Sequence, residues 1–229
     1  MIPISIAMAA AISAAAGPGM HPAEMQVREG SRSALTMGSS WYGPTGLITI
    51  PTAYVSDSRQ ARFSAFFGEN VSVAAVNYGL VPYVEVGGAF VDRDNASNKF
   101  VANAKVTLVP SNFNFFELGV GVIDAADAID QTIYFVASAD VVPPKVEVDE
   151  AGGLPVGFKV HVGAGTGMFK EKAFFGGELL FGNKVSLMGE WDTSNFNAGL
   201  RWVPVEHFSI QTGFRRTSMF LTATTSFRF

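Results

Sequence analysis

Apolar and polar residues alternate with a period of two along most of the chain after residue 59, as they do in β-strands whose two faces meet different surroundings. Residues 184–191 illustrate the pattern, because Leu187 and Trp191 share one parity while Ser186 and Glu190 share the other. A period of two cannot persist through an α-helix. The alternation therefore predicts an all-β chain.

The carboxyl-terminal segment, Thr217 to Phe229, alternates in the same way and ends in an aromatic residue, with Phe220 as the exception on its polar parity. Such an ending is typical of outer-membrane β-barrels. One face of the strand suits lipid and the other suits water.

Twelve strand-like segments follow one another at the spacing of an antiparallel meander. Their expected bounds are Ala61–Phe67, Val71–Tyr78, Tyr83–Val91, Val101–Val109, Phe115–Ile123, Thr132–Asp140, Val156–Ala164, Ala173–Phe181, Val185–Trp191, Phe196–Val203, Phe208–Arg215 and Ser218–Phe229.

A barrel of about 12 strands is too wide for a modest set of Val and Phe side chains to fill, so we expect the apolar parity to face outward. A strand of ~10 residues tilted by ~40–45° spans ~25 Å, the height of an outer-membrane apolar band. The sequence therefore predicts an antiparallel meander transmembrane β-barrel. A soluble two-sheet sandwich would show the same alternation and stays an alternative.

Charged residues on the polar parity would then line the lumen, where basic residues avoid a cost of ~2–4 kcal/mol at the bilayer midplane. The candidate pore-lining residues are Lys105, Glu117, Lys159, Glu178, Glu190 and Arg201.

The amino end predicts export, because an apolar run from Ile4 to Ile12 precedes Ala14-Ala15-Ala16, a small-x-small cleavage pattern. We assign residues 1–16 to a signal peptide, residues 17–45 to a Gly/Ser-rich linker at the mature amino terminus, and residues 46–229 to the barrel. The sequence does not decide whether residues 46–53 form a strand or fold into the barrel.

The stretch from Val142 to Pro155 is too long for a tight turn, and either a miscounted strand or a periplasmic contact or plug would explain it.

Composition restricts the kinds of partner and of chemical site that we expect for this chain. The 229 residues suit one structural unit, and the 16 Lys and Arg residues are scattered singly rather than clustered, so we expect no nucleic-acid partner. The chain has no cysteine, and therefore neither disulfides nor thiolate metal sites. Neither Asp124, Asp127 and Asp130 nor residues 147–150 have the ligand spacing of a calcium loop. The three histidines have no nucleophile pattern around them, so we expect no catalytic residues, no metal and no cofactor.

Several motifs resemble the YjbH-like outer-membrane proteins, a family associated with exopolysaccharide production and secretion. Residues 46–53, Gly-Leu-Ile-Thr-Ile-Pro-Thr-Ala, are similar to that family's start. Residues 79–87 resemble its Gly-Leu-x-Pro-x-x-Glu-x-Gly hairpin and residues 105–110 its Lys-x-x-Leu-x-Pro turn. Residues 116–124, 135–138, 189–192 and 197–201 are similar to later motifs in the same order. The chain is shorter than the best-known members and lacks the lipobox cysteine that some of them carry. The resemblance implies a single-barrel relative.

These observations leave three hypotheses. The first is a non-enzymatic outer-membrane barrel that forms a pore or scaffold for exopolysaccharide export. Its partners would be membrane lipid, polysaccharide, periplasmic export proteins and, through Phe229, the outer-membrane insertion machinery. The second is a plugged structural envelope barrel without transport. The third is a secreted soluble β-protein that binds a ligand.

Overall fold

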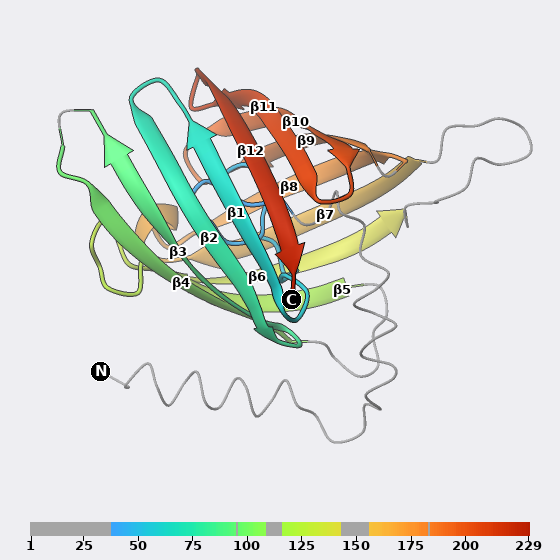
Figure 1. Ribbon diagram of the computed structural model, residues 1–229, viewed down its shortest axis with the longest axis horizontal. Coiled ribbons are helices and arrows are strands. Elements are labelled where there is room, and N and C mark those ends of the chain that lie inside the picture. The colour runs from blue at the N-terminus through green and yellow to red at the C-terminus, as the bar shows by residue number, and fades with distance from the viewer. Residues whose placement is uncertain (1–37, 95, 109–115, 143–155, 183) are drawn as a thin grey trace, which may run out of the picture.

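Twelve antiparallel strands form a closed barrel in the computed structural model, which describes residues 38–94, 96–108, 116–142, 156–182 and 184–229 (Figure 1). The strands are β1 (Gln60–Phe67), β2 (Val71–Val81), β3 (Val84–Arg93), β4 (Lys99–Leu108), β5 (Phe116–Ile123), β6 (Thr132–Val142), β7 (Val156–Gly165), β8 (Lys172–Phe181), β9 (Val185–Trp191), β10 (Phe196–Val205), β11 (Phe208–Arg215) and β12 (Ser218–Arg228). A short 3-10 helix, η2 (Gly167–Phe169), lies between β7 and β8.

All twelve predicted strands are present, with bounds that differ from the prediction by no more than three residues. The predicted strand ends Val109 and Phe115 lie outside the described residues. The all-β fold class and the antiparallel meander are confirmed.

Closure depends on the pairing of β1 with β12, where Phe63 lies opposite Thr225 and Ser64 opposite Thr224. Every other pair joins strands that are adjacent in sequence. A closed ring leaves no sheet edge, so the ladder supplies partners for the backbone groups of each strand on both sides. No helix in the described part of the chain is long and apolar enough to cross a bilayer.

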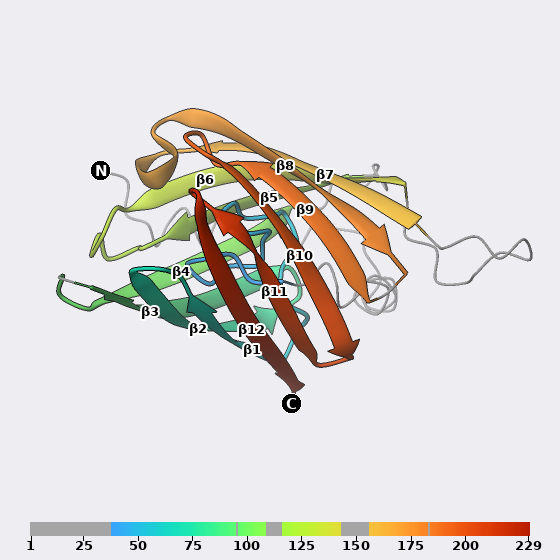
Figure 2. The same ribbon diagram turned by 90° about the horizontal axis from the view of Figure 1, so that it is seen from above.

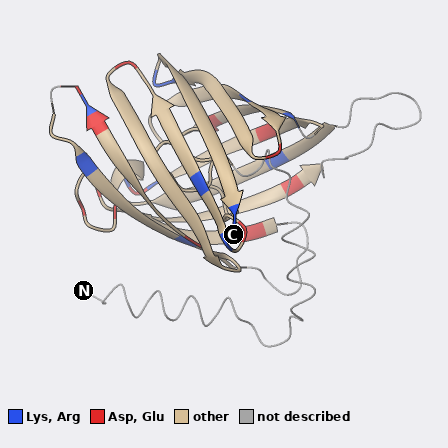
Figure 3. Ribbon diagram, viewed as in Figure 1, with Lys and Arg blue, Asp and Glu red and all other residues tan. Residues whose placement is uncertain are grey.

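The two parities face opposite sides, as predicted. Trp191, Leu200 and Trp202 lie on the outer surface with 36%, 37% and 46% of their area exposed. Glu190 and Arg201, which alternate with them, point inward and are 1% exposed. Most of each strand lacks charged residues (Figure 3). The barrel therefore has an apolar outer face and a charged inner face.

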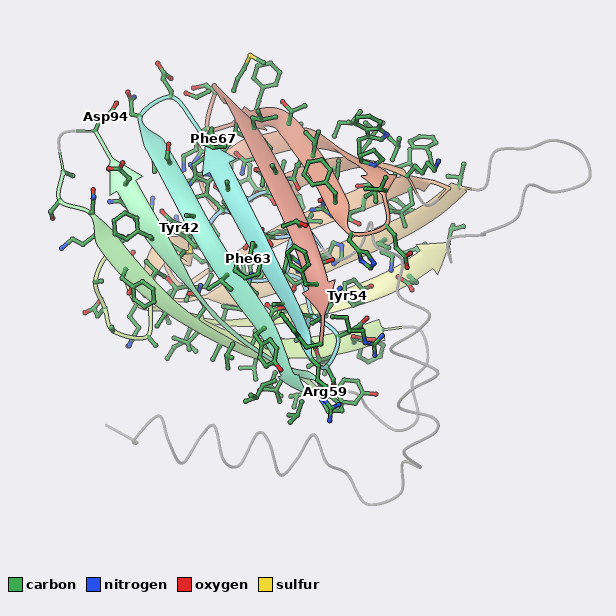
Figure 4. All side chains as sticks on the ribbon, in the orientation of Figure 1. Tyr42, Tyr54, Arg59, Phe63, Phe67 and Asp94 are labelled. Carbon is green, nitrogen blue, oxygen red and sulfur yellow. The ribbon has the colours of Figure 1, made fainter. Side chains whose placement is uncertain are left out.

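An even number of strands places the start of β1 and the end of β12 at one end of the barrel, which we call the carboxyl-terminal mouth (Figure 1). Arg59 lies at this mouth, whereas Phe67 and Asp94 lie at the opposite end (Figure 4). Residues 143–155, whose length made them a candidate plug or contact loop, lie outside the described residues. The predicted signal peptide and most of the predicted linker lie outside them as well.

Residues 38–58, which we call the inner segment, run inside the ring of strands (blue in Figures 1 and 2). The inner segment includes residues 38–45, assigned from sequence to the linker, and it continues through the motif at residues 46–53. Its presence explains Phe220, the one large apolar residue on the polar parity of β12. Phe220 faces inward, where its ring lies 6.3 Å from that of Trp41.

Candidate functional site

The inner segment has almost no regular structure of its own. Internal backbone hydrogen bonds hold its shape, among them those from Ser40 N to Pro44 O over 2.8 Å, from Trp41 N to Ile48 O over 2.9 Å and from Thr52 N to Thr45 O over 3.1 Å. Gly43 has a φ of 110°, a conformation that side chains rarely adopt, and it permits the first turn. Most of the segment is buried. Its remaining polar backbone groups therefore need partners on the barrel wall.

Glu190 on β9 provides one such contact. Its carboxylate accepts hydrogen bonds from three consecutive backbone amides, Ile48 (3.0 Å), Thr49 (2.7 Å) and Ile50 (3.2 Å). Asn197 Nδ2 on β10 also donates to the carboxylate over 2.9 Å. One buried anion thus fixes the bend of the inner segment at residues 48–50.

Glu85 on β3 holds two points of the segment at once. It accepts hydrogen bonds from the backbone amide and the hydroxyl of Thr45, and from those of Ser56. Lys105, directly opposite on β4, lies 3.7 Å from the carboxylate and donates to Thr45 O over 2.8 Å and Thr52 O over 3.3 Å. Arg62 Nη1 donates to Thr45 Oγ1 over 2.9 Å.

Arg201 on β10 binds both the wall and the segment. Its guanidinium donates to Glu178 on β8 over 3.1 Å and to Gln211 on β11 over 3.0 Å. The same group donates to Gly46 O over 3.0 Å. Gln211 Nε2 donates to Leu47 O over 3.2 Å. A single cation therefore joins three strands to the first half of the segment.

The second half of the segment contacts β6 and β7. Ala53 N donates to Ser138 Oγ over 2.9 Å, and Ser138 is 2.8 Å from His161 Nδ1. Tyr54 donates its hydroxyl to Asp140 over 3.0 Å, and Lys159 forms a 2.6 Å ion pair with Asp140. The Lys159 ammonium also lies 4.6 Å from the centre of the Tyr54 ring.

Apolar contacts predominate around Trp41, away from the carboxyl-terminal mouth. The Trp41 ring lies 5.6 Å from that of Phe66 and packs against Phe220, and the Arg215 guanidinium lies 4.1 Å from its centre. Leu47, Ile48 and Ile50 belong to the same buried cluster.

Inward-facing glycines make room for these contacts. A Cβ atom on Gly176 would lie 2.7 Å from Leu47 Cδ1, and one on Gly119 would lie 2.9 Å from Ala53 Cα. Gly119, on the inward parity of β5, therefore leaves room for the segment at Ala53. Gly121 and Gly163 instead make room for the wall side chains of Tyr134 and Phe174.

The structure places all six predicted pore-lining residues on the inward parity. Five of them are at most 5% exposed: Lys105, Lys159, Glu178, Glu190 and Arg201. Glu117, near the carboxyl-terminal mouth on β5, is half-buried. Lys105, Lys159, Glu190 and Arg201 bond directly to the inner segment, and Glu178 binds Arg201. The groups expected to line a hydrated passage thus hold a folded segment.

Sequence reasoning missed the partners of these charges, among them Thr45, Ser56, Asn197 and Gln211. They are single polar residues with no spacing motif. The sequence signals that could have indicated a filled lumen were the inward Phe220 and the inward glycines.

The described residues contain no group of three His, Asp or Glu side chains arranged to hold a metal ion. The Asp124 carboxylate accepts hydrogen bonds from the backbone amides of residues 128–130, and so closes the turn between β5 and β6. Residues 147–150 lie outside the described residues.

A cavity of about 160 Å³ opens at the carboxyl-terminal mouth. Asp57 and Gln60, where the inner segment joins β1, line it together with Arg62, Thr224 and Arg228. The lumen is therefore less filled beside this junction.

No known family model matches the chain. No curated protein matches it either. Among solved structures, the chain is similar to a "KdgM porin", with a TM-score of 0.49 and 9% identity over 74% of this chain and 99% of that one. It is also similar to a "KdgM porin in complex with disordered oligogalacturonate", with a TM-score of 0.48 and 8% identity over the same shares of the two chains. At this level of similarity the fold assignment rests on the strand order of the chain itself.

Proposed function

We propose that the protein is a non-enzymatic outer-membrane β-barrel whose lumen is closed by its own residues 38–58, and that it serves as a structural element of the cell envelope. The observation that carries this proposal is the pairing of the charged lumen wall with the backbone of the inner segment. Glu190, Glu85 and Arg201 each bind two or more polar groups of that segment.

The outer face supports a lipid environment. Large apolar side chains with at least a third of their area exposed occur on every strand except β5, among them Phe63, Phe100, Phe135, Phe175 and Phe214. Soluble monomers rarely expose apolar patches larger than a few hundred Å². A patch that nearly encircles the barrel is better explained by contact with acyl chains than by one partner protein. The strands, seven to eleven residues long, match the height of an outer-membrane apolar band.

The same distribution disfavours the secreted soluble β-protein. A soluble sandwich would bury Trp191 and Trp202 and expose Glu190 and Arg201, whereas the barrel does the reverse.

The link to exopolysaccharide production remains a proposal that comes from the resemblance to the YjbH-like proteins. Residues 46–53, which resemble that family's opening motif, form the centre of the inner segment, and Glu85, in the stretch that resembles its Gly-Leu-x-Pro hairpin, binds Thr45 and Ser56. The motifs thus coincide with the contacts that close the lumen. On this proposal, periplasmic export proteins and polysaccharide are partners of the barrel, and Phe229 is the recognition element for the insertion machinery.

The proposal is tested by membrane fractionation, heat-modifiability in detergent gels and planar-bilayer recording of the folded chain. We expect the protein in the outer-membrane fraction, a mobility shift on boiling, and no sustained ionic conductance at rest. A protein that stays in the aqueous fraction would exclude the membrane barrel. A folded barrel that conducts steadily without any treatment would exclude the closed lumen. Loss of surface polysaccharide in a strain without the protein tests the envelope role.

A further inference from the structure

Closure of the barrel does not depend on the inner segment. Each of the twelve strands pairs with two neighbouring strands, and the segment contributes only isolated bridges, one of which joins Ser58 to Gly79 on β2. Wall side chains bond the segment instead, and water can replace such bonds one by one. Removing the segment from the lumen would therefore leave the strand ladder intact.

Three of the wall cations also do not need the segment for neutralisation. Asp57 is the only charged residue among residues 38–58. The wall cations pair with wall anions on neighbouring or nearby strands: Lys105 with Glu85, Lys159 with Asp140 and Arg201 with Glu178. An emptied lumen would keep its ion pairs and gain water, which is a favourable environment for charged groups.

The attachment of the segment sets the direction in which it can leave. Arg59 is fixed at the carboxyl-terminal mouth, because its amide donates to Gly79 O over 2.8 Å and its carbonyl accepts from Phe229 N over 3.0 Å. The segment joins β1 at this point, beside the 160 Å³ cavity lined by Asp57 and Gln60. The shortest path out of the lumen therefore runs through the carboxyl-terminal mouth, with residues 56–58 as the pivot.

We propose that residues 38–58 are a displaceable plug, and that its release toward the carboxyl-terminal mouth opens a water-filled passage for ions and small hydrophilic solutes. The proposal rests on the membrane barrel of the preceding section. The apolar packing of Trp41 against Phe66 and Phe220 keeps the plug in place at rest. Because the wall carries cations and anions side by side, the open passage discriminates little between them.

A disulfide provides the test. Ser39 Oγ in the plug lies 2.8 Å from Ser64 Oγ on β1, so the double variant Ser39→Cys/Ser64→Cys brings two thiols together in a chain without other cysteines. Wild type and variant are recorded in planar bilayers while urea is raised, and the heat-modifiability band shows at each step that the barrel remains folded. The two single-cysteine variants are controls.

We expect wild type, both single variants and the reduced double variant to gain conductance in urea and to lose it on dilution. The oxidised double variant should lose this response and stay closed. Conductance of the oxidised variant equal to that of the reduced one would overturn plug release, as would a wild type that never conducts before its barrel unfolds. In both cases a chain that inserts and shows the heat shift leaves the membrane barrel intact, so the two proposals fail separately.

Thiol labelling gives a second readout that does not depend on the engineered disulfide. Ser186 on β9 is fully buried on the inner face, and its hydroxyl has no hydrogen-bond partner in the described structure, so Ser186→Cys should fold. We expect a small hydrophilic thiol reagent to modify Ser186→Cys only in urea, and to modify Ser194→Cys on the exposed turn after β9 at all concentrations. Urea-independent labelling of both positions would contradict a plug that closes the lumen.

Discussion

Individual charged residues in the lumen act as partners for backbone groups. An irregular segment cannot pair all of its amides and carbonyls internally, and each buried group without a partner costs roughly 1–3 kcal/mol. Glu190 supplies acceptors for three amides, and Arg201 and Gln211 supply donors for the carbonyls of Gly46 and Leu47. Ionised groups suit this role because their hydrogen bonds are about twice as strong as those between neutral groups.

Glu190 therefore offers a direct test at the scale of one residue. We expect Glu190→Gln to lower the free energy of unfolding by about 2–3 kcal/mol, because the side-chain amide presents N–H groups where backbone donors need an acceptor. The measurement is urea unfolding of the folded barrel, followed by tryptophan emission. The matched control is Glu171→Gln on the exposed turn between β7 and β8, which should leave the midpoint unchanged. Equal midpoints for the two variants would show that Glu190 does not hold the inner segment.

At the scale of elements, the strands were predictable because they are repetitive. Each of them alternates apolar and polar residues, and turn residues interrupt the pattern at regular distances, as Gly182 does between β8 and β9. The orientation of each parity was predictable as well. A ring of twelve strands is so wide that its Val and Phe side chains could not fill the lumen if they pointed inward, so they were expected to point outward.

The inner segment was not predictable in the same way, because its contacts are neither periodic nor local. Residues 38–58 bind partners up to 166 positions away, as the contact of Thr49 with Arg215 shows. Its Gly, Ser, Thr and Pro content is typical of a linker, and only the tertiary contacts show otherwise. The candidate lumen residues were therefore correctly placed on the inner face, while the group they bind was left undecided.

The contact between the end of the inner segment and strand β2 can be tested by a substitution. Gly79 on β2 faces the segment so closely that a Cβ atom would lie 1.9 Å from Asp57 O and 2.7 Å from Ser56 O. We expect Gly79→Ala to cost about 1–3 kcal/mol of stability, because the segment must shift to relieve the overlap. The measurement is again the urea midpoint of the folded barrel.

Gly189→Ala is the matched control, because its Cβ would meet only the Phe196 ring, at 3.5 Å or more, an ordinary contact. If the Gly79 variant were as stable as the Gly189 variant, the inner segment would not pass as close to β2 as it does in the structure.

The whole molecule has the reverse of a soluble protein's polarity. Its charges lie around a nearly neutral inner segment, and its large apolar side chains lie outside. In water this arrangement would be costly, since each exposed apolar Å² forgoes about 25 cal/mol of burial free energy. In a bilayer the same surface is matched to its surroundings. The cost of placing a charge on the outer face should therefore depend on whether lipid or water surrounds the barrel.

Substitution of an outward residue by Arg distinguishes the two surroundings, because the change in the free energy of unfolding differs between lipid and water. Leu200 lies in the middle of β10 and points outward, and Val205, 61% exposed, lies at the end of the same strand. We expect Leu200→Arg to lower the free energy of unfolding from a bilayer by about 2–4 kcal/mol and Val205→Arg by about 0–1 kcal/mol, because the cost of a charge falls from the bilayer midplane to its surface. Reversible unfolding from lipid vesicles gives both values. A soluble protein would tolerate Arg equally well at both exposed positions, so equal costs would place the outer face of the barrel in water.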